Sequence, residues 1–174
     1  LSFDDNLTYL KEFEHITLSR ALIAEYQSSR AVRSILDALG LLERLLQAAE
    51  AGNRNGSVLE ILMIKALAHQ ARGDTPQACA PLERALTLAE PEGYVRIFVD
   101  EGEPMRSLLL GFRSWIEKQS HSRDRELSGY VSKLLSSFEE QERVDAAKTS
   151  PVEPLSPREL EVLQLIAQGL SNRE

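Results

Sequence analysis

The sequence predicts an all-α protein, built as an α-solenoid of stacked helix pairs with a C-terminal helical cap. Apolar side chains recur at spacings of three to five residues along almost every long segment, while strand patterns are weak. One stretch also repeats after about forty residues. Helices of this kind each bury one apolar face, so we expect them to stack against neighbouring pairs.

The first four periodic segments predict helices over 7–26, 31–51, 57–72 and 75–90. The run YVRIFVD at 94–100 alternates polar and apolar side chains, but it has no partner run. We interpret it as a loop that leads into a helix, with a short strand as the alternative.

An internal repeat supports the stacked pairs. LERLLQAAE at 42–50 and LERALTLAE at 82–90 share six of nine positions at an offset of forty. RALIA at 20–24 resembles KALAH at 65–69 at an offset of forty-five, so the first unit has about five extra residues between its helices, around QSSRAVRS. Chance likeness of two Leu/Ala-rich helices is the alternative, and the repeated Glu-Arg pair argues against it.

The second unit has the residue types that a tight helix pair needs. Its small residues, which let two helices approach closely, are Ala66, Ala78 and Ala85. Gly73 suits a left-handed helix end, and Asp74 or Thr75 can cap the next helix. This pattern resembles a tetratricopeptide repeat (TPR). Lys65 and His69 depart from it, because the family has large apolar residues there, so the repeat is divergent.

Two further helices are predicted after the repeats. PMRSLLLGFRSWIEKQ begins near Pro104, ELSGYVSKLLSSFEEQ follows it, and we expect the pair to cover the open end of the solenoid. Trp115 is interpreted as a packing residue rather than a binding residue. The polar, proline-containing DAAKTSPVEP has the composition of a linker. The predicted domains are therefore 1–144, a linker over 145–154, and 155–174.

The last segment reads LSPRELEVLQLIAQGLSNRE, with Ser156 and Glu159 spaced as a capping box. The string resembles the opening of a LuxR-type helix-turn-helix domain, which implies a partial helix-turn-helix here and DNA as a partner of the full-length parent only. The resemblance implies that Ser171, Asn172 and Arg173 face phosphate at a helix N-terminus; capping and solvation alone are the alternative. We expect no specific DNA affinity from residues 1–174 alone.

The preceding stretch, from EILMIKALAHQ to the EGEPM motif, resembles the region ahead of the DNA-binding domain in MalT-like ATP-dependent LuxR activators. The resemblance implies a sensor that binds a small inducer or a protein partner and helps self-association. The TPR pattern implies that its concave groove is lined by Glu60, Met63, Leu67 and Gln70, although packing against adjacent repeats is the alternative role of these residues. ATP is implied only for a module outside this chain, because no GxxxxGK[ST] motif occurs in it. A start without Met and a stop within the motif lead us to expect a piece of a longer protein.

Composition narrows the remaining classes. The 174 residues carry a formal net charge of −7 and one cysteine, with no apolar run long enough to span a membrane, so we expect a cytoplasmic protein. The histidines, which lack the spacing of a metal pair, are His15, His69 and His121. We therefore assign no catalytic, cofactor-binding or metal-binding residue. A stand-alone TPR-like scaffold for protein–protein contacts and a helical enzyme are the alternative functions.

Overall fold

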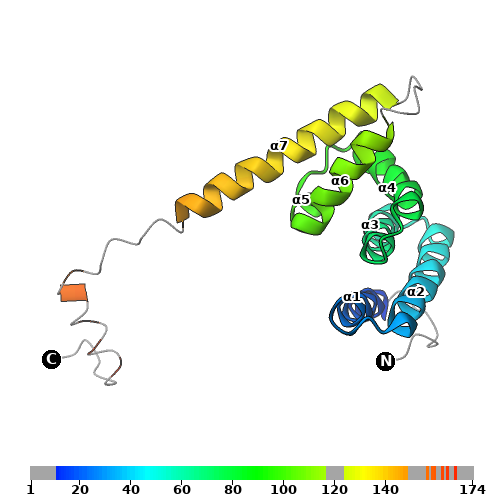
Figure 1. Cartoon of the computed structure of the whole chain (residues 1–174), viewed down its shortest axis with the longest axis horizontal. Helices are drawn as coiled ribbons and strands as arrows, with labels where there is room; N and C mark the ends of the chain where they lie inside the picture. The colour runs from blue at the N-terminus through cyan, green and yellow to red at the C-terminus, as the bar shows by residue number, and fades with distance from the viewer. Residues whose placement is uncertain are drawn as a thin grey trace. The chain divides into compact units, whose positions relative to one another are not determined.

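The computed structural model describes residues 11–116 and 124–148, together with the single residues 156, 158, 159, 162, 164 and 167. Within this part the chain forms helices and no strand, which confirms the predicted all-α class. The helices are α1 (Glu12–Ser29), α2 (Val32–Ala51), α3 (Asn55–Ala71), α4 (Thr75–Ala89), α5 (Arg96–Val99), α6 (Glu103–Ile116) and α7 (Asp124–Lys148) (Figure 1). The chain divides into two compact units, Leu1–Phe138 and Glu139–Glu174.

The first four helices form two neighbouring pairs, α1 with α2 and α3 with α4 (Figure 1). Helix α2 also packs against α3, so the second pair stacks directly on the first, as the internal repeat predicts. The small side chains that permit this close approach are fully buried, namely Ala38, Ala66, Ala78 and Ala85. A larger side chain at these positions would force the helices apart.

The turn of the second pair follows the sequence prediction. Gly73 has a φ of 77°, in the left-handed region where a Cβ is unfavourable. The Asp74 side chain caps α4 by accepting a hydrogen bond from the Gln77 backbone N–H at 3.4 Å. In the first pair Arg30 takes the left-handed position with a φ of 57°, and its guanidinium lies 5.6 Å from the centre of the Tyr26 ring.

The extra residues of the first repeat lengthen its helices and not its loop. Helices α1 and α2 have 18 and 20 residues, whereas α3 and α4 have 17 and 15. Only residues 30–31 connect α1 with α2. The stretch QSSRAVRS contains neither glycine nor proline, and both helices extend into it, with the break confined to Arg30 and Ala31.

The segment after the repeats covers the second pair. Helix α6 packs against α3, α4 and α5. The apolar face of α6 is buried. The apolar face of α7 is buried too, and it comprises Leu127, Val131, Leu134, Leu135 and Phe138. Trp115 is partly buried and stacks on Phe112 with ring centres 5.5 Å apart, which is a packing contact. These faces form the predicted cap.

The YVRIFVD segment contains the four-residue helix α5, so the strand alternative is wrong. A lone strand would leave its backbone groups unpaired, whereas the helix bonds them locally. The Tyr130 hydroxyl of α7 donates a hydrogen bond to the Tyr94 carbonyl at the start of this segment. The Tyr130 ring also meets the edge of Phe98 at 6.2 Å and 88°, so α7 anchors the α5 segment.

Beyond Phe138, helix α7 continues to Lys148, four residues into the segment interpreted as a linker. In the second unit the Ser156 backbone N–H donates to Glu159 Oε2 at 2.7 Å, and the Glu159 N–H donates to Ser156 Oγ at 3.4 Å. These two bonds confirm the predicted capping box. The Ser156 hydroxyl also donates to Glu159, and these bonds lower the pKa of that carboxyl.

Candidate functional site

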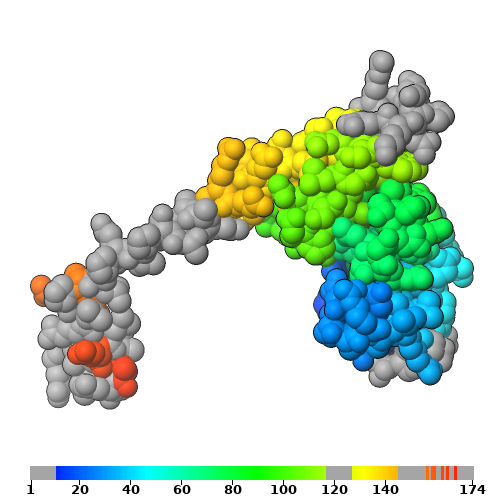
Figure 2. All heavy atoms as spheres, viewed as in Figure 1, coloured from blue at the N-terminus to red at the C-terminus, as the bar shows by residue number. Residues whose placement is uncertain are grey.

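A cavity of about 560 Å³ opens between α1, α3 and the segment that leads into α6. The space-filling view shows the surface indented between α1 and that segment (Figure 2). The cavity lies entirely within the first compact unit. Ligand pockets typically measure roughly 300–1,000 Å³, so this cavity is large enough for a small molecule or part of a peptide.

Aliphatic side chains from both repeats line the floor. They are Ile23 and Ala24 of α1, Ile64, Leu67 and Ala71 of α3, and Pro104 of α6. The lining residues of α1 lie at 20, 23, 24 and 27, and those of α3 at 64, 67, 70 and 71. This spacing places each set on one face of its helix, so the cavity lies between one face of α1 and one face of α3.

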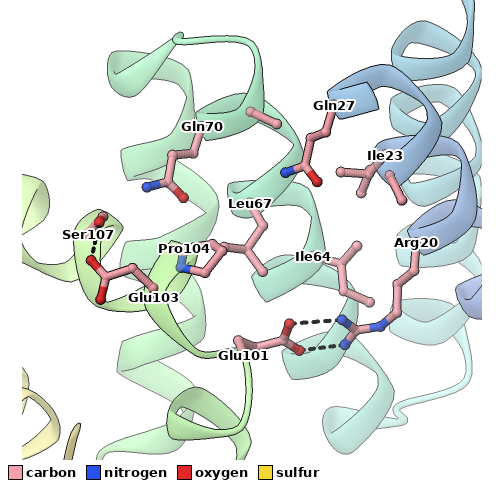
Figure 3. Close-up of a pocket in the computed structure, with 12 residues that line it drawn as sticks. Arg20, Ile23, Gln27, Ile64, Leu67, Gln70, Glu101, Glu103, Pro104 and Ser107 are labelled. Carbon is pink, nitrogen blue, oxygen red and sulfur yellow. Dashed lines mark hydrogen bonds and ion pairs between the residues drawn. The ribbon is translucent and has the colours of Figure 1, made fainter. Parts of the chain in front are cut away.

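An ion pair between Arg20 of α1 and Glu101 closes one end of the cavity (Figure 3). Arg20 Nη1 donates to Glu101 Oε2 at 2.9 Å, and Nη2 donates to Oε1 at 2.5 Å. Glu60 Oε1 lies 3.8 Å from the same guanidinium. The hydrogen bond to Glu101 is the main reason that the pKa of Arg20 is raised. The guanidinium therefore stays charged and already has two acidic neighbours.

The other end of the cavity carries two carboxamides. Gln27 of α1 and Gln70 of α3 reach into the cavity above Leu67 (Figure 3). Neither carboxamide has a hydrogen-bond partner within the part of the chain that the structure describes. Each therefore presents two N–H donors and a carbonyl acceptor for a ligand.

Glu103, the first residue of α6, lines the third side of the cavity. Its carboxylate accepts a hydrogen bond from the Ser107 hydroxyl at 2.9 Å and lies 3.4 Å from Arg106 Nη1. An acidic residue here also favours the helix N-terminus. Glu101 precedes α6 and pairs with Arg20 instead.

Comparison with known proteins shows which family the chain belongs to. The family model described as the MalT-like TPR region matches residues 2–114. The chain belongs to this family. A second model, bacterial regulatory proteins of the luxR family, matches residues 153–174 of this MalT-like chain. No solved structure matches it.

Two curated relatives of this MalT-like chain are HTH-type transcriptional regulators MalT from Klebsiella pneumoniae. The protein of strain 342 is 29% identical over 190 residues, and that of strain ATCC 700721 / MGH 78578 is 28% identical over 190 residues. Each alignment covers 99% of this chain and 19% of the relative. The chain thus spans about a fifth of the length of the relatives that it matches.

Of the four groove residues implied by the TPR pattern, Leu67 and Gln70 line the cavity of the MalT-like region. Glu60 lies at its end beside Arg20. Met63 is fully buried in the core, and its neighbour Ile64 lines the cavity instead. One residue is a rotation of about 100° on an α-helix, which is enough to move a side chain from the wall into the core.

The sequence reasoning missed the contributions of α1 and of the segment before α6 to this MalT-like cavity. Arg20, Gln27, Glu101 and Glu103 all line it. The spacing of Arg20, Ile23 and Gln27 on one face of α1 was a usable signal. Glu101 offered none, because its contact with α1 spans 81 residues of sequence.

No group of three metal-ligating side chains occurs among the described residues. His15 is buried, and its Nδ1 lies 2.7 Å from the Lys11 carbonyl oxygen. Burial, with a smaller effect from Lys65, lowers the pKa of His69. His121 lies outside the described residues, as do the predicted phosphate-facing residues Ser171, Asn172 and Arg173.

Two further features bear on function. Burial raises the pKa of the Cys79 thiol, which disfavours the reactive thiolate. None of the helices that the structure describes is both long and apolar enough to cross a membrane.

Proposed function

We propose that this chain is the effector-sensing and protein-interaction segment of a LuxR-family DNA-binding transcriptional regulator, and that the cavity between α1, α3 and α6 is its recognition site. The observation that carries the proposal is the cavity itself, because it lies within the MalT-like TPR region and upstream of a luxR-family segment. A stand-alone scaffold would not account for the second match, which is to the luxR-family model.

The geometry suits a sensor because the cavity joins three parts of the fold. A bound ligand would touch the first repeat through α1, the second repeat through α3, and the cap through α6. Such a ligand stabilises the arrangement in which these parts are close, and it shifts any equilibrium with a more open arrangement. The role of this chain is recognition rather than catalysis. The complete regulator would bind DNA and act in the cytoplasm. ATP would bind a module outside residues 1–174.

A ligand screen tests the recognition site. Leu67→Trp fills the cavity from its floor, whereas Leu88→Trp is the matched control on α4, at a residue that does not line the cavity. We expect metabolites that raise the melting temperature of the wild-type chain to lose this effect in L67W and keep it in L88W. Ligands that stabilise L67W as much as wild type would refute the site.

The same two variants in a complete regulator test the sensor role. We expect L67W to remove the response of a transcription reporter to the inducer, while L88W keeps it. A normal response in L67W, at a normal protein level, would refute the proposed function.

A further inference from the structure

We propose that the cavity takes a ligand that carries no negative charge and has an apolar body and a primary amide head, which pairs with Gln27 and Gln70. This inference rests on the proposed function, since it names the class of ligand for the same cavity. Three properties of the lining carry it: two carboxamides without hydrogen-bond partners among the described residues, the lack of an available cation among the lining residues, and the aliphatic floor.

The carboxamides of Gln27 and Gln70 define the head group. They enter the same end of the cavity from neighbouring helices (Figure 3) and have no partner in the described part of the chain. A carboxamide offers both donors and an acceptor, so a ligand amide uses both kinds of group. An ester or a ketone only accepts, so it cannot donate to the carbonyl of the paired glutamine.

The charges of the lining exclude an anion. Arg20 is the one cationic residue among those that line the cavity, and both of its terminal nitrogens are bonded to Glu101. Glu60 lies close to the same guanidinium, and Glu103 adds a further carboxylate to the lining. A ligand carboxylate would therefore meet an acidic lining whose only cation is already paired.

The aliphatic floor of the cavity determines which kind of ligand body fits there. Between the two polar ends lie Ile23, Ile64 and Leu67, with Pro104 opposite (Figure 3). None of these side chains can form a hydrogen bond, so polar ligand atoms above them would lose water without compensation. A hydrocarbon or aromatic body placed there is instead removed from water favourably.

Four compounds with one shared body test the inference on the full 174-residue chain. They are 3-phenylpropanamide, methyl 3-phenylpropanoate, 3-phenylpropanoate and 3-phenylpropylamine. Binding is followed by NMR, from the side-chain N–H signals of Gln27 and Gln70 and the methyl signals of Ile64 and Leu67. We expect the amide to shift both sets and to bind about tenfold more tightly than the ester, with the carboxylate weakest.

Near-isosteric variants test the named residues. Gln27→Met and Gln70→Met keep the length of the side chains but remove the amides, so the amide should lose its advantage over the ester in the double variant. Gln47→Met is the control, because Gln47 is exposed on α2 and does not line the cavity. Circular dichroism melting verifies that each variant is folded.

The outcomes separate this inference from the proposed function. Binding of the carboxylate or of the amine as tight as that of the amide, an amide advantage that survives in the double variant, or binding by none of the four compounds would each overturn the ligand class. The cavity-filling L67W variant in the complete regulator tests the sensor role independently. A reporter response that depends on Leu67, together with any of these three results, would leave the sensor intact and the amide class wrong.

Discussion

Arg20 and Glu101 join the first repeat to the segment that follows the second, across 81 residues of sequence, through two hydrogen bonds of 2.9 and 2.5 Å. The Glu101 side chain is 15% exposed and that of Arg20 is 41% exposed. A planar two-bond contact with one partner mostly buried is among the stronger forms of ion pair. It fixes the distance across the cavity, because each residue comes from one of its walls.

We expect this pair to contribute measurable coupling. In a double-mutant cycle of Arg20→Ala and Glu101→Ala, the coupling free energy should be about 1 kcal/mol, reduced by the exposure of Arg20. Urea unfolding, followed by the fluorescence of Trp115, gives the four free energies of unfolding. The coupling should shrink in 1 M salt, because salt screens the exposed guanidinium.

The control cycle is Arg33 with Asp37, whose closest atoms are 3.6 Å apart and whose arginine side chain is 87% exposed. We expect about 0.3 kcal/mol there. Equal coupling in the two cycles would mean that the two-bond geometry of Arg20 and Glu101 adds nothing.

The buried carboxylate of Glu12 should matter more than its surface neighbours. It accepts hydrogen bonds from Arg54 Nη2 at 2.7 Å and from the Ser57 hydroxyl at 2.5 Å, and its side chain is 10% exposed. Glu12→Ala leaves the Arg54 charge half-buried without this acceptor, so we expect a loss of about 2 kcal/mol. Glu14→Ala, on the exposed side of the same turn, should change the free energy of unfolding by less than about 0.5 kcal/mol. Similar losses in both variants would contradict this account.

Replacing glycine by alanine should change the stability of the chain in opposite directions at two positions. Gly73 has a φ of 77°, so Gly73→Ala should destabilise the chain by about 1 kcal/mol. Gly40 lies inside α2, and a Cβ built there meets no atom within 4 Å. Gly40→Ala should therefore stabilise it by about 1 kcal/mol, since alanine favours a helix. Thermal melting of both variants measures the two signs, and a shift of the same sign in both would refute the assigned backbone roles.

The fold was predictable because it depends on local patterns. Apolar spacing gave the helices, and the repeated nonapeptide gave their stacking. Some of the charges that repeat along with the apolar residues link the two repeats: Glu43 pairs with Lys65 of α3, and Glu50 with Arg84 of α4 at 2.6 Å. These glutamates join one repeat to the next. The pairing with Lys65 lowers the pKa of the Glu43 carboxyl.

The cavity was only partly predictable because it depends on contacts between distant segments. Of the residues that the TPR pattern implies for the groove, Leu67 and Gln70 line the cavity, whereas Met63 is buried one residue away from the lining residue Ile64. The contribution of α1 depends on how the first pair is rotated against the second, which no local pattern specifies. The role of Glu101 could not be predicted, because its partner on α1 is remote in sequence.

Tyr130 makes the stability of the chain vary with pH in the alkaline range. The residue is 6% exposed, and its hydroxyl donates to the Tyr94 carbonyl. Burial, with a smaller effect from Glu90, raises the pKa of this phenol from 10 to about 12. The folded state therefore holds the neutral phenol at a pH where the unfolded chain has already released the proton.

The free energy of unfolding should consequently fall as the pH rises from 10 to about 12, because only the unfolded state loses this proton in that window. The full contribution is present below pH 10. Tyr130→Phe cannot ionise, so its stability should fall less over the same window, by up to about 2 kcal/mol. At pH 7 the variant should be about 1 kcal/mol less stable, because the Tyr94 carbonyl loses its donor. Tyr94→Phe is the control, since its ring is 49% exposed. Parallel pH curves for wild type and Y130F in urea unfolding would show that Tyr130 is not the group responsible.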